Sequence, residues 1–186
     1  MCCCMPFRRF GLFLAALVVA GFAIQAARSW SAAETEQGKS DGAQKRAEAL
    51  GIKFEKQEPG YLNGCVKSGK LLFSSGFGSK MKGRLGKDLT VDEGYKAAQD
   101  CCHQILRAVW QTHGTLDNLR VVKVLGCVNS APEFYDQPKV INGGSDLLHE
   151  IFGARTDGWH ARSALGFAAL PNGCAVEIEA IFEIKD

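Results

Sequence analysis

Alternating runs of apolar and polar residues from position 60 onward predict a series of strands and helices. Two short apolar runs, Tyr61–Val66 and Leu71–Ser75, flank a polar Lys-Ser-Gly-Lys turn, which predicts a β-hairpin. Residues Val121–Val128 form a β-branched run typical of a buried strand. The last two strands are predicted over Ala161–Leu170 and Ala175–Ile184, because a Pro-Asn-Gly-Cys turn separates them.

Two further segments carry the start and stop signals of helices. Thr90 and Glu93 form a capping box, and apolar residues then recur with helical spacing as far as Gly114, the expected C-terminal stop. A second helix is predicted to begin near Pro138, since proline favours the first helical turn, and to end by Gly153.

The predicted order of elements, β-β-α-β-α-β-β, is that of an α+β domain in which a mixed sheet carries two helices on one face. Gly143 and Gly144 would weaken the second helix, so we expect another element to pack closely there. The chain has no further element to cover the opposite face of the sheet. Self-association is therefore the expected cover.

The first 33 residues differ in composition from the rest of the chain. They contain no Asp or Glu, and an apolar run extends from Phe10 to Ile24. This run has the length of a signal peptide and is short for a membrane span. We therefore expect residues 1–33 to be a targeting or anchor segment, which implies the secretory pathway or a membrane, with the mitochondrion or another organelle as the alternative.

The next segment, residues 34–59, is polar and predicts a linker with a helical turn near Ala43–Leu50. The folded domain is then expected over residues 60–186. A domain over residues 60–186 has the usual length of a single folded domain.

Charge and cysteine content restrict the possible functions. A net charge of +2 gives no electrostatic reason to expect nucleic-acid binding. Three of the eight cysteines stand at positions 2–4, and the other five lack the spacing of metal ligands. These five are expected to be small buried hydrophobic residues, with a disulfide framework or a zinc site as the alternatives. No metal is predicted.

The final two strands carry the candidate chemistry. Arg162 stands among small and apolar residues, where a guanidinium needs an anion, and its planar fork suits a carboxylate. Glu177 on the neighbouring strand could accept and donate protons or position a water. The alternatives are an exposed arginine at a strand end and a glutamate on a solvated strand face. Nearby His160 is expected to have a surface or structural role.

The segment from His160 to Leu170, followed after five residues by Val-Glu-Ile, resembles the signature of the RidA/YjgF family of reactive-intermediate deaminases. The resemblance covers about Gly60 to Ile184, and Lys123–Asn142 resembles a branch labelled endoribonuclease L-PSP or chorismate-mutase-like. The residues at signature positions are Arg162, Leu165, Ala168, Leu170, Val176 and Glu177.

The resemblance implies a chorismate-mutase-like fold and a homotrimer with a cleft between each pair of subunits. Members of the family hydrolyse 2-aminoacrylate and related enamines or imines to 2-keto acids and ammonia, without a cofactor. By the resemblance, Arg162 would hold the substrate carboxylate and Glu177 would position or activate the water. Tyr61 and Asn142 would line the pocket. His160 departs from the family, which usually has Pro or Ala at this position.

Two other functions remain open from the sequence. One is a non-catalytic trimer that binds small carboxylic acids, and the other is a ribonuclease. The near-neutral charge and the lack of a basic-aromatic stripe argue against specific RNA recognition. The expected partners are therefore a small carboxylate-bearing substrate and further copies of the chain, with membrane contact through residues 1–33 alone.

Overall fold

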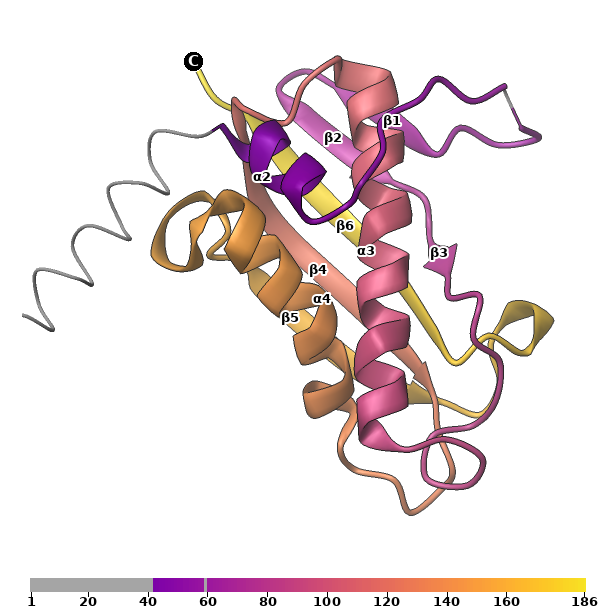
Figure 1. Cartoon of the computed structure of the whole chain (residues 1–186). Helices are drawn as coiled ribbons and strands as arrows, with labels where there is room; N and C mark the ends of the chain where they lie inside the picture. Colours follow the sequence, from indigo (N-terminus) through magenta and orange to yellow (C-terminus); the bar gives the residue numbers. More distant parts are fainter. Residues whose placement is uncertain (1–41, 59) are drawn as a thin grey trace, which may run out of the picture. The chain divides into compact units, whose positions relative to one another are not determined.

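The computed structural model describes residues 42–58 and 60–186, in which helices cover one face of a six-stranded sheet (Figure 1). The strand order is β1-β2-β6-β4-β5, with β3 paired to β6 beyond the end of β2. All neighbours are antiparallel except β4 and β5, which are parallel. The strands are β1 (Cys65–Ser68), β2 (Leu71–Ser74), β3 (Phe77–Gly78), β4 (Leu119–Asn129), β5 (Ala161–Phe167) and β6 (Val176–Ile184). This mixed α+β sheet confirms the predicted fold class.

Helix α3 (Val91–His113) begins and ends where its sequence predicts. The backbone N–H of Glu93 donates to the Thr90 hydroxyl, and the backbone N–H of Thr90 donates to the Glu93 carboxylate at 2.8 Å. Gly114 ends the helix in the left-handed conformation, with φ 94°. These local interactions satisfy backbone groups that the helix itself leaves free.

Helix α4 (Gln137–Phe152) packs against α3 at the glycine pair. A Cβ atom at Gly143 would lie 2.0 Å from the carbonyl oxygen of Tyr95, and one at Gly144 would lie 2.8 Å from Cys102 Sγ. Only glycine fits at such a separation, so the backbones of the two helices meet there. The close packing expected at this pair is confirmed.

Strand β6 shows that one face of the sheet is buried and the other is more exposed. Val176, Ile178, Ala180 and Phe182 are buried beneath the helices, and the alternate residues lie on the opposite face. That opposite face, here called the open face, has no helix over it in the part of the chain that the structure describes (Figure 1).

The segment predicted as a linker contributes to the core from residue 43 onward. It forms helix α2 (Ala43–Ala49), and both Ala47 and Ile52 are buried. Phe54 then packs on Trp110 of α3, with ring centroids 5.5 Å apart. The linker prediction therefore does not hold for residues 43–54, although the helical turn expected near Ala43–Leu50 forms as α2; residues 34–41 lie outside the described residues. The segment has few apolar residues, but Ala43 and Ala47 lie one helical turn apart and both are buried.

The predicted hairpin forms from β1 and β2, but it begins later than expected. Strand β1 starts at Cys65, and Tyr61 lies before it in irregular backbone with its side chain fully exposed. The expectation that Tyr61 opens a strand is therefore wrong. Asn63 and Gly64 in this stretch instead bond to Ser75 across the base of the hairpin.

All five cysteines of residues 42–58 and 60–186 are free. Four are buried, as predicted for small hydrophobic residues, and Cys127 is half-buried. Burial raises the pKa of the Cys102 thiol to about 12, so this group stays protonated at neutral pH. No three His, Cys, Asp or Glu side chains among the described residues are grouped to hold a metal ion.

The predicted localisation requires correction. No helix within residues 42–58 and 60–186 is both long and apolar enough to cross a bilayer. The apolar run Phe10–Ile24, on which a secretory, membrane or organelle location depended, belongs to the segment 1–33, which lies outside the described residues. We therefore assign no compartment and no membrane contact.

Candidate functional site

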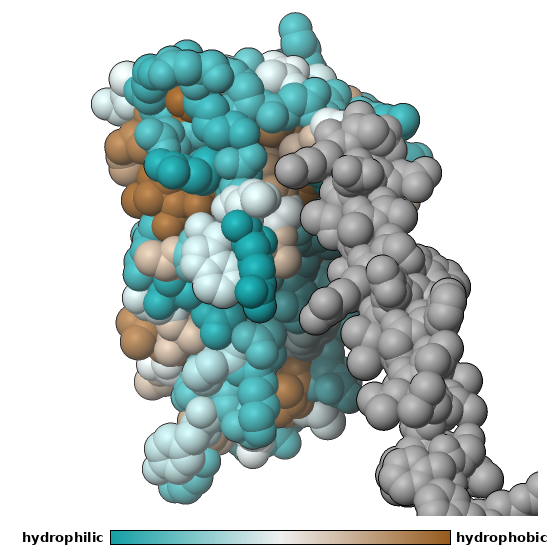
Figure 2. All heavy atoms as spheres, turned by 90° about the vertical axis from the view of Figure 1, so that its left-hand side faces the viewer, coloured by the Kyte–Doolittle hydropathy of each residue, from teal (hydrophilic) through white to brown (hydrophobic). Residues whose placement is uncertain are grey.

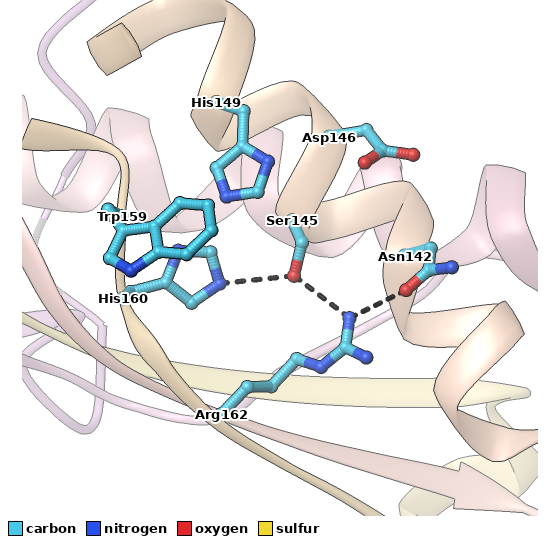
Figure 3. A pocket seen from close by; sticks show the side chains of 7 residues that line it. All are labelled: Asn142, Ser145, Asp146, His149, Trp159, His160 and Arg162. Carbon is cyan, nitrogen blue, oxygen red and sulfur yellow. Dashed lines mark hydrogen bonds between the residues drawn. The ribbon is translucent and has the colours of Figure 1, made fainter. Parts of the chain in front are cut away.

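Asn142 of α4 and Arg162 of β5, both predicted as site residues, lie in direct contact (Figure 3). Nη1 of Arg162 donates to Oδ1 of Asn142 at 2.9 Å and to Oγ of Ser145 at 3.0 Å. Its Nη2 makes only a long contact, 3.4 Å, with the carbonyl of Pro138. One side of the guanidinium is thus fixed by the protein, and Nη2 and Nε are left to meet a ligand.

These residues line a cavity of about 290 Å³, which we call the Arg162 cavity. Its wall is made by one face of α4 and by the start of β5 (Figure 3). The lining residues are Asn142, Ser145, Asp146, His149, Trp159, His160 and Arg162.

Local structure explains why these side chains converge. The four lining residues from α4 are spaced by three, four and seven positions, so they share one face of the helix. The turn η1 (Gly153–Asp157) then reverses the chain, starting from Gly153 with φ 94°. Residues 159–162 consequently run back along α4 into β5.

Ser145 and His160 form a hydrogen-bonded pair at the wall of this cavity. The Oγ atom of Ser145 lies 3.0 Å from Nε2 of His160, and Nδ1 of His160 lies 2.6 Å from the carbonyl oxygen of Gly158. A carbonyl can only accept, so Nδ1 carries the proton and Nε2 accepts from the serine hydroxyl in the neutral ring. Burial lowers the pKa of His160, which favours this neutral form.

The charge of Arg162 has no carboxylate ion-pair partner among the described residues. Asp146, whose charge acts on Arg162, accepts a hydrogen bond from the Tyr95 hydroxyl at 2.9 Å. Burial lowers the pKa of Arg162, and Asp146 partly opposes this shift. A half-desolvated guanidinium without a carboxylate partner has the chemistry to bind an anionic ligand.

Glu177 lies on the opposite face of the sheet from Arg162. Arg162 is in register with Val124 of β4, a buried residue of the helix-covered face. Glu177 is in register with Cys127 and with Gly78, and its side chain alternates with the buried residues of β6. Within one protomer the structure therefore does not bring Glu177 into the Arg162 cavity.

The carboxylate of Glu177 lies instead against the backbone near Gly76. A Cβ atom added to Gly76 would stand 2.4 Å from Oε1 of Glu177, so a side chain there would displace the carboxylate. The negative charge of Glu177 also raises the pKa of the half-buried Cys127 thiol, after the larger effect of burial.

Tyr61 is also separate from Arg162 within one protomer. It precedes β1, at one edge of the sheet, whereas β5 with Arg162 forms the other edge. Of the four predicted site residues, the structure brings together Asn142 and Arg162 and leaves Tyr61 and Glu177 apart.

Several cavity residues were missed from the sequence. Ser145, Asp146 and His149 follow Asn142 along a polar stripe of α4, and this spacing is the signal that could have identified them. The sequence predicts a surface or structural role for His160, and no motif in it singles out Trp159. The ring of His149 lies near both, with its centroid 6.1 Å from that of Trp159 and 5.3 Å from that of His160.

Comparisons with known proteins agree with this fold. The chain is 37% identical to Atu1372 of Agrobacterium tumefaciens, a protein "with unknown function", over 81% of this chain and 98% of that one, with a TM-score of 0.71. It is 25% identical to a "putative endoribonuclease" of Shewanella oneidensis over 77% and 100% of the two chains, with a TM-score of 0.70.

A curated relative, Protein TCP17 of Trypanosoma cruzi, is 46% identical over 110 residues, which is 59% of this chain and 68% of that protein. The family model described as "YjgF/chorismate_mutase-like, putative endoribonuclease" matches residues 53–180, well over half of the chain. The match includes β1 to β5 and both long helices. This chain therefore belongs to the YjgF/chorismate-mutase-like family.

Proposed function

We propose that this protein hydrolyses reactive enamines and imines of the 2-aminoacrylate and 2-iminopropionate type to 2-keto acids and ammonia. The observation that carries the proposal is Arg162. Its guanidinium is half-buried, is held on one side by Asn142 and Ser145, and has no carboxylate partner among the described residues. A small substrate carboxylate supplies the missing anion.

The chemistry requires little beyond correct placement. An enamine tautomerises to an imine, whose carbon is already electrophilic toward water. With the substrate carboxylate bound to Nη2 and Nε of Arg162, the adjacent imine carbon lies within the cavity of about 290 Å³. Holding this carbon beside one water lowers the entropic part of the barrier, and general acid–base help lowers the rest.

We further propose that the protein works as a homotrimer with its sites between subunits. The open face carries exposed apolar side chains on four strands, namely Val66, Phe73, Val122, Leu165 and Phe167. Apolar side chains gather at the left-hand margin of Figure 2, the side that faces away from the viewer of Figure 1. Several large apolar side chains exposed on one face of a sheet are typical of a subunit interface.

A closed ring of subunits would also explain the separation of the predicted site residues. Strand β5 with Arg162 is at one edge of the sheet, and Tyr61 precedes the strand at the other edge. In a ring, the first edge of each subunit faces the second edge of its neighbour. Tyr61 and Glu177 then reach the Arg162 cavity from a second copy.

The decisive assay supplies freshly generated 2-aminoacrylate and follows pyruvate or ammonia in the presence of the full-length chain. We expect consumption of the imine well above its rate in buffer, and we expect Arg162→Lys to abolish most of the excess. Arg107→Lys is the matched control, because Arg107 of α3 likewise donates to a backbone carbonyl, that of Lys53. A wild-type protein that binds 2-keto acids without accelerating imine loss would favour the non-catalytic carboxylate binder. The position of Glu177 on the opposite face of the sheet within one protomer also favours that alternative.

Subunit mixing tests whether the sites are shared. Arg162→Lys and Glu177→Gln are each expected to be much less active alone than the wild type. If one site takes its arginine and its glutamate from different subunits, unfolding and refolding the two variants together restores some native sites. Light scattering should give the mass of a trimer, and a stable monomer at micromolar concentration would contradict the assembly.

A further inference from the structure

We propose that Ser145 and His160 form a proton relay that serves the Arg162 cavity. In this relay the Ser145 hydroxyl takes a proton from the attacking water while it passes its own proton to Nε2 of His160. The proposal deepens the proposed function and rests on it. It assigns a role to two residues that the comparison with the family signature left without one.

The geometry is that of an activated hydroxyl. Ser145 Oγ and His160 Nε2 are 3.0 Å apart, within the range expected for a hydroxyl and its base. The Gly158 carbonyl accepts from Nδ1 and thereby fixes the orientation of the ring and its tautomer. Ser145 lines the cavity, and its oxygen points toward both His160 and Arg162 (Figure 3).

Arg162 completes the arrangement from a second direction. Its Nη1 donates to the same Ser145 oxygen at 3.0 Å, so a positive charge stands beside this atom as its proton departs. An adjacent cation favours the oxygen with more negative charge. One residue thus anchors the substrate and polarises the hydroxyl.

The groups that surround His160 keep its ring neutral. Burial is the largest cause of its lowered pKa, and the nearby His149 of α4 and Arg162 of β5 act in the same direction. The Gly158 carbonyl acts in the opposite direction. Asp146 of α4 also lines the cavity, but it is exposed and bound to the Tyr95 hydroxyl. The imidazole is therefore ready to accept a proton at neutral pH.

The relay conserves atoms and charge. Water attacks the carbon of the protonated imine, its oxygen forms the new C–O bond, and the C=N π electron pair moves to nitrogen. One water proton moves to Ser145 as the serine proton moves to Nε2 of His160. The neutral carbinolamine then takes this proton back on its nitrogen through Ser145. The C–N bond breaks and its electron pair leaves with ammonia, while the carbinol hydroxyl proton passes through Ser145 to His160 and then to ammonia or solvent, which leaves a 2-keto acid.

A structural role is the competing interpretation, in which Ser145 and His160 only hold Arg162 in place. His160→Gln separates the two roles. A glutamine amide oxygen can still accept from Ser145 and support Arg162, but it cannot take up a proton at neutral pH. The relay predicts a fall in kcat on the order of 10²-fold with little change in KM. A structural role predicts a raised KM.

The pH dependence gives a second, independent readout. His160 must be neutral to accept a proton, so kcat is lost as the pH falls through the lowered pKa of this ring. The acidic limb of the profile should disappear in His160→Gln and in Ser145→Ala. His103→Gln is the matched control: burial likewise lowers the pKa of His103, which lies on α3 outside the Arg162 cavity. This variant should keep the wild-type profile.

Nitrogen NMR of histidine-labelled wild-type protein tests the relay without any variant that could fail to fold. We expect His160 to be neutral at pH 7 with its proton on Nδ1. A charged ring, or a proton on Nε2, would overturn the relay. If the wild-type protein is active and His160→Gln keeps the same kcat and the same acidic limb, the relay is wrong and the proposed function stands. If the wild-type protein is inactive on the imine, both the relay and the proposed function are wrong.

Discussion

Replacement of Arg162 by lysine tests the basis of the site most directly. The change keeps the positive charge and removes the planar fork. In the protein, Nη1 donates to Asn142 and Ser145, and Nη2 donates to the Pro138 carbonyl at 3.4 Å. The proposed carboxylate site is the second N–H of Nη2 together with Nε. A lysine ammonium has one nitrogen and a shorter reach, so it cannot bond to both sets of partners at once.

The expected loss follows from the bonds at risk. A hydrogen bond to a charged group contributes about 1.5–3 kcal/mol, and the substitution removes the second of two parallel bonds to the carboxylate. The dissociation constant of a small 2-keto acid should therefore rise by roughly 10- to 150-fold. Titration calorimetry with 2-ketobutyrate measures this change without requiring catalysis.

Two controls make the result interpretable. Arg107→Lys should leave the dissociation constant unchanged, because Arg107 lies on α3 and bonds to the Lys53 carbonyl. The melting temperature of Arg162→Lys reports whether the loss of its bonds to Asn142 and Ser145 disturbs the fold. An intact Arg162→Lys protein that binds 2-ketobutyrate as tightly as the wild type would refute our placement of the carboxylate.

Two further predictions concern the scaffold that positions the site. Gly143→Ala places a Cβ atom 2.0 Å from the Tyr95 carbonyl, so α3 and α4 must separate. We expect a loss of about 3 kcal/mol or more in unfolding free energy by urea titration, and a loss below about 1 kcal/mol would show that the helices yield easily. Thr90→Ala removes the N-cap of α3 and should cost about 1 kcal/mol, seen as a melting temperature lowered by roughly 2–4 °C, whereas Thr90→Ser should retain most of the wild-type stability.

Local signals in the sequence were sufficient to predict helices α3 and α4 and their ends. The capping box at Thr90 and the stop at Gly114 depend on residues a few positions away, so their spacing alone is informative. Gly143 and Gly144 indicated a close contact but not its partner. Tyr95 and Cys102, which provide that contact, lie more than 40 positions earlier in the chain.

The side of the sheet on which each candidate residue lies was harder to predict. In β6 buried residues alternate with more exposed ones, so Glu177 lies on the other face of the sheet from Val176 and Ile178. Strand β5 has no such alternation, because small residues surround Arg162 and its exposed end is apolar. The sequence placed the arginine and the glutamate on adjacent strands, whereas β4 lies between them and the two face opposite ways.

This separation leads to different kinetic behaviour for the two parts of the proposed chemistry. The relay of Ser145 and His160 joins Arg162 within one protomer, so its hydrogen bonds do not depend on assembly. In the proposed trimer Glu177 would reach the same substrate from a second copy, so its contribution would be lost when subunits separate. Specific activity that falls on dilution together with the trimer mass would indicate a shared site. Activity that persists in the separated protomer would assign the proton transfer to the relay, because only its groups remain beside the carboxylate anchor.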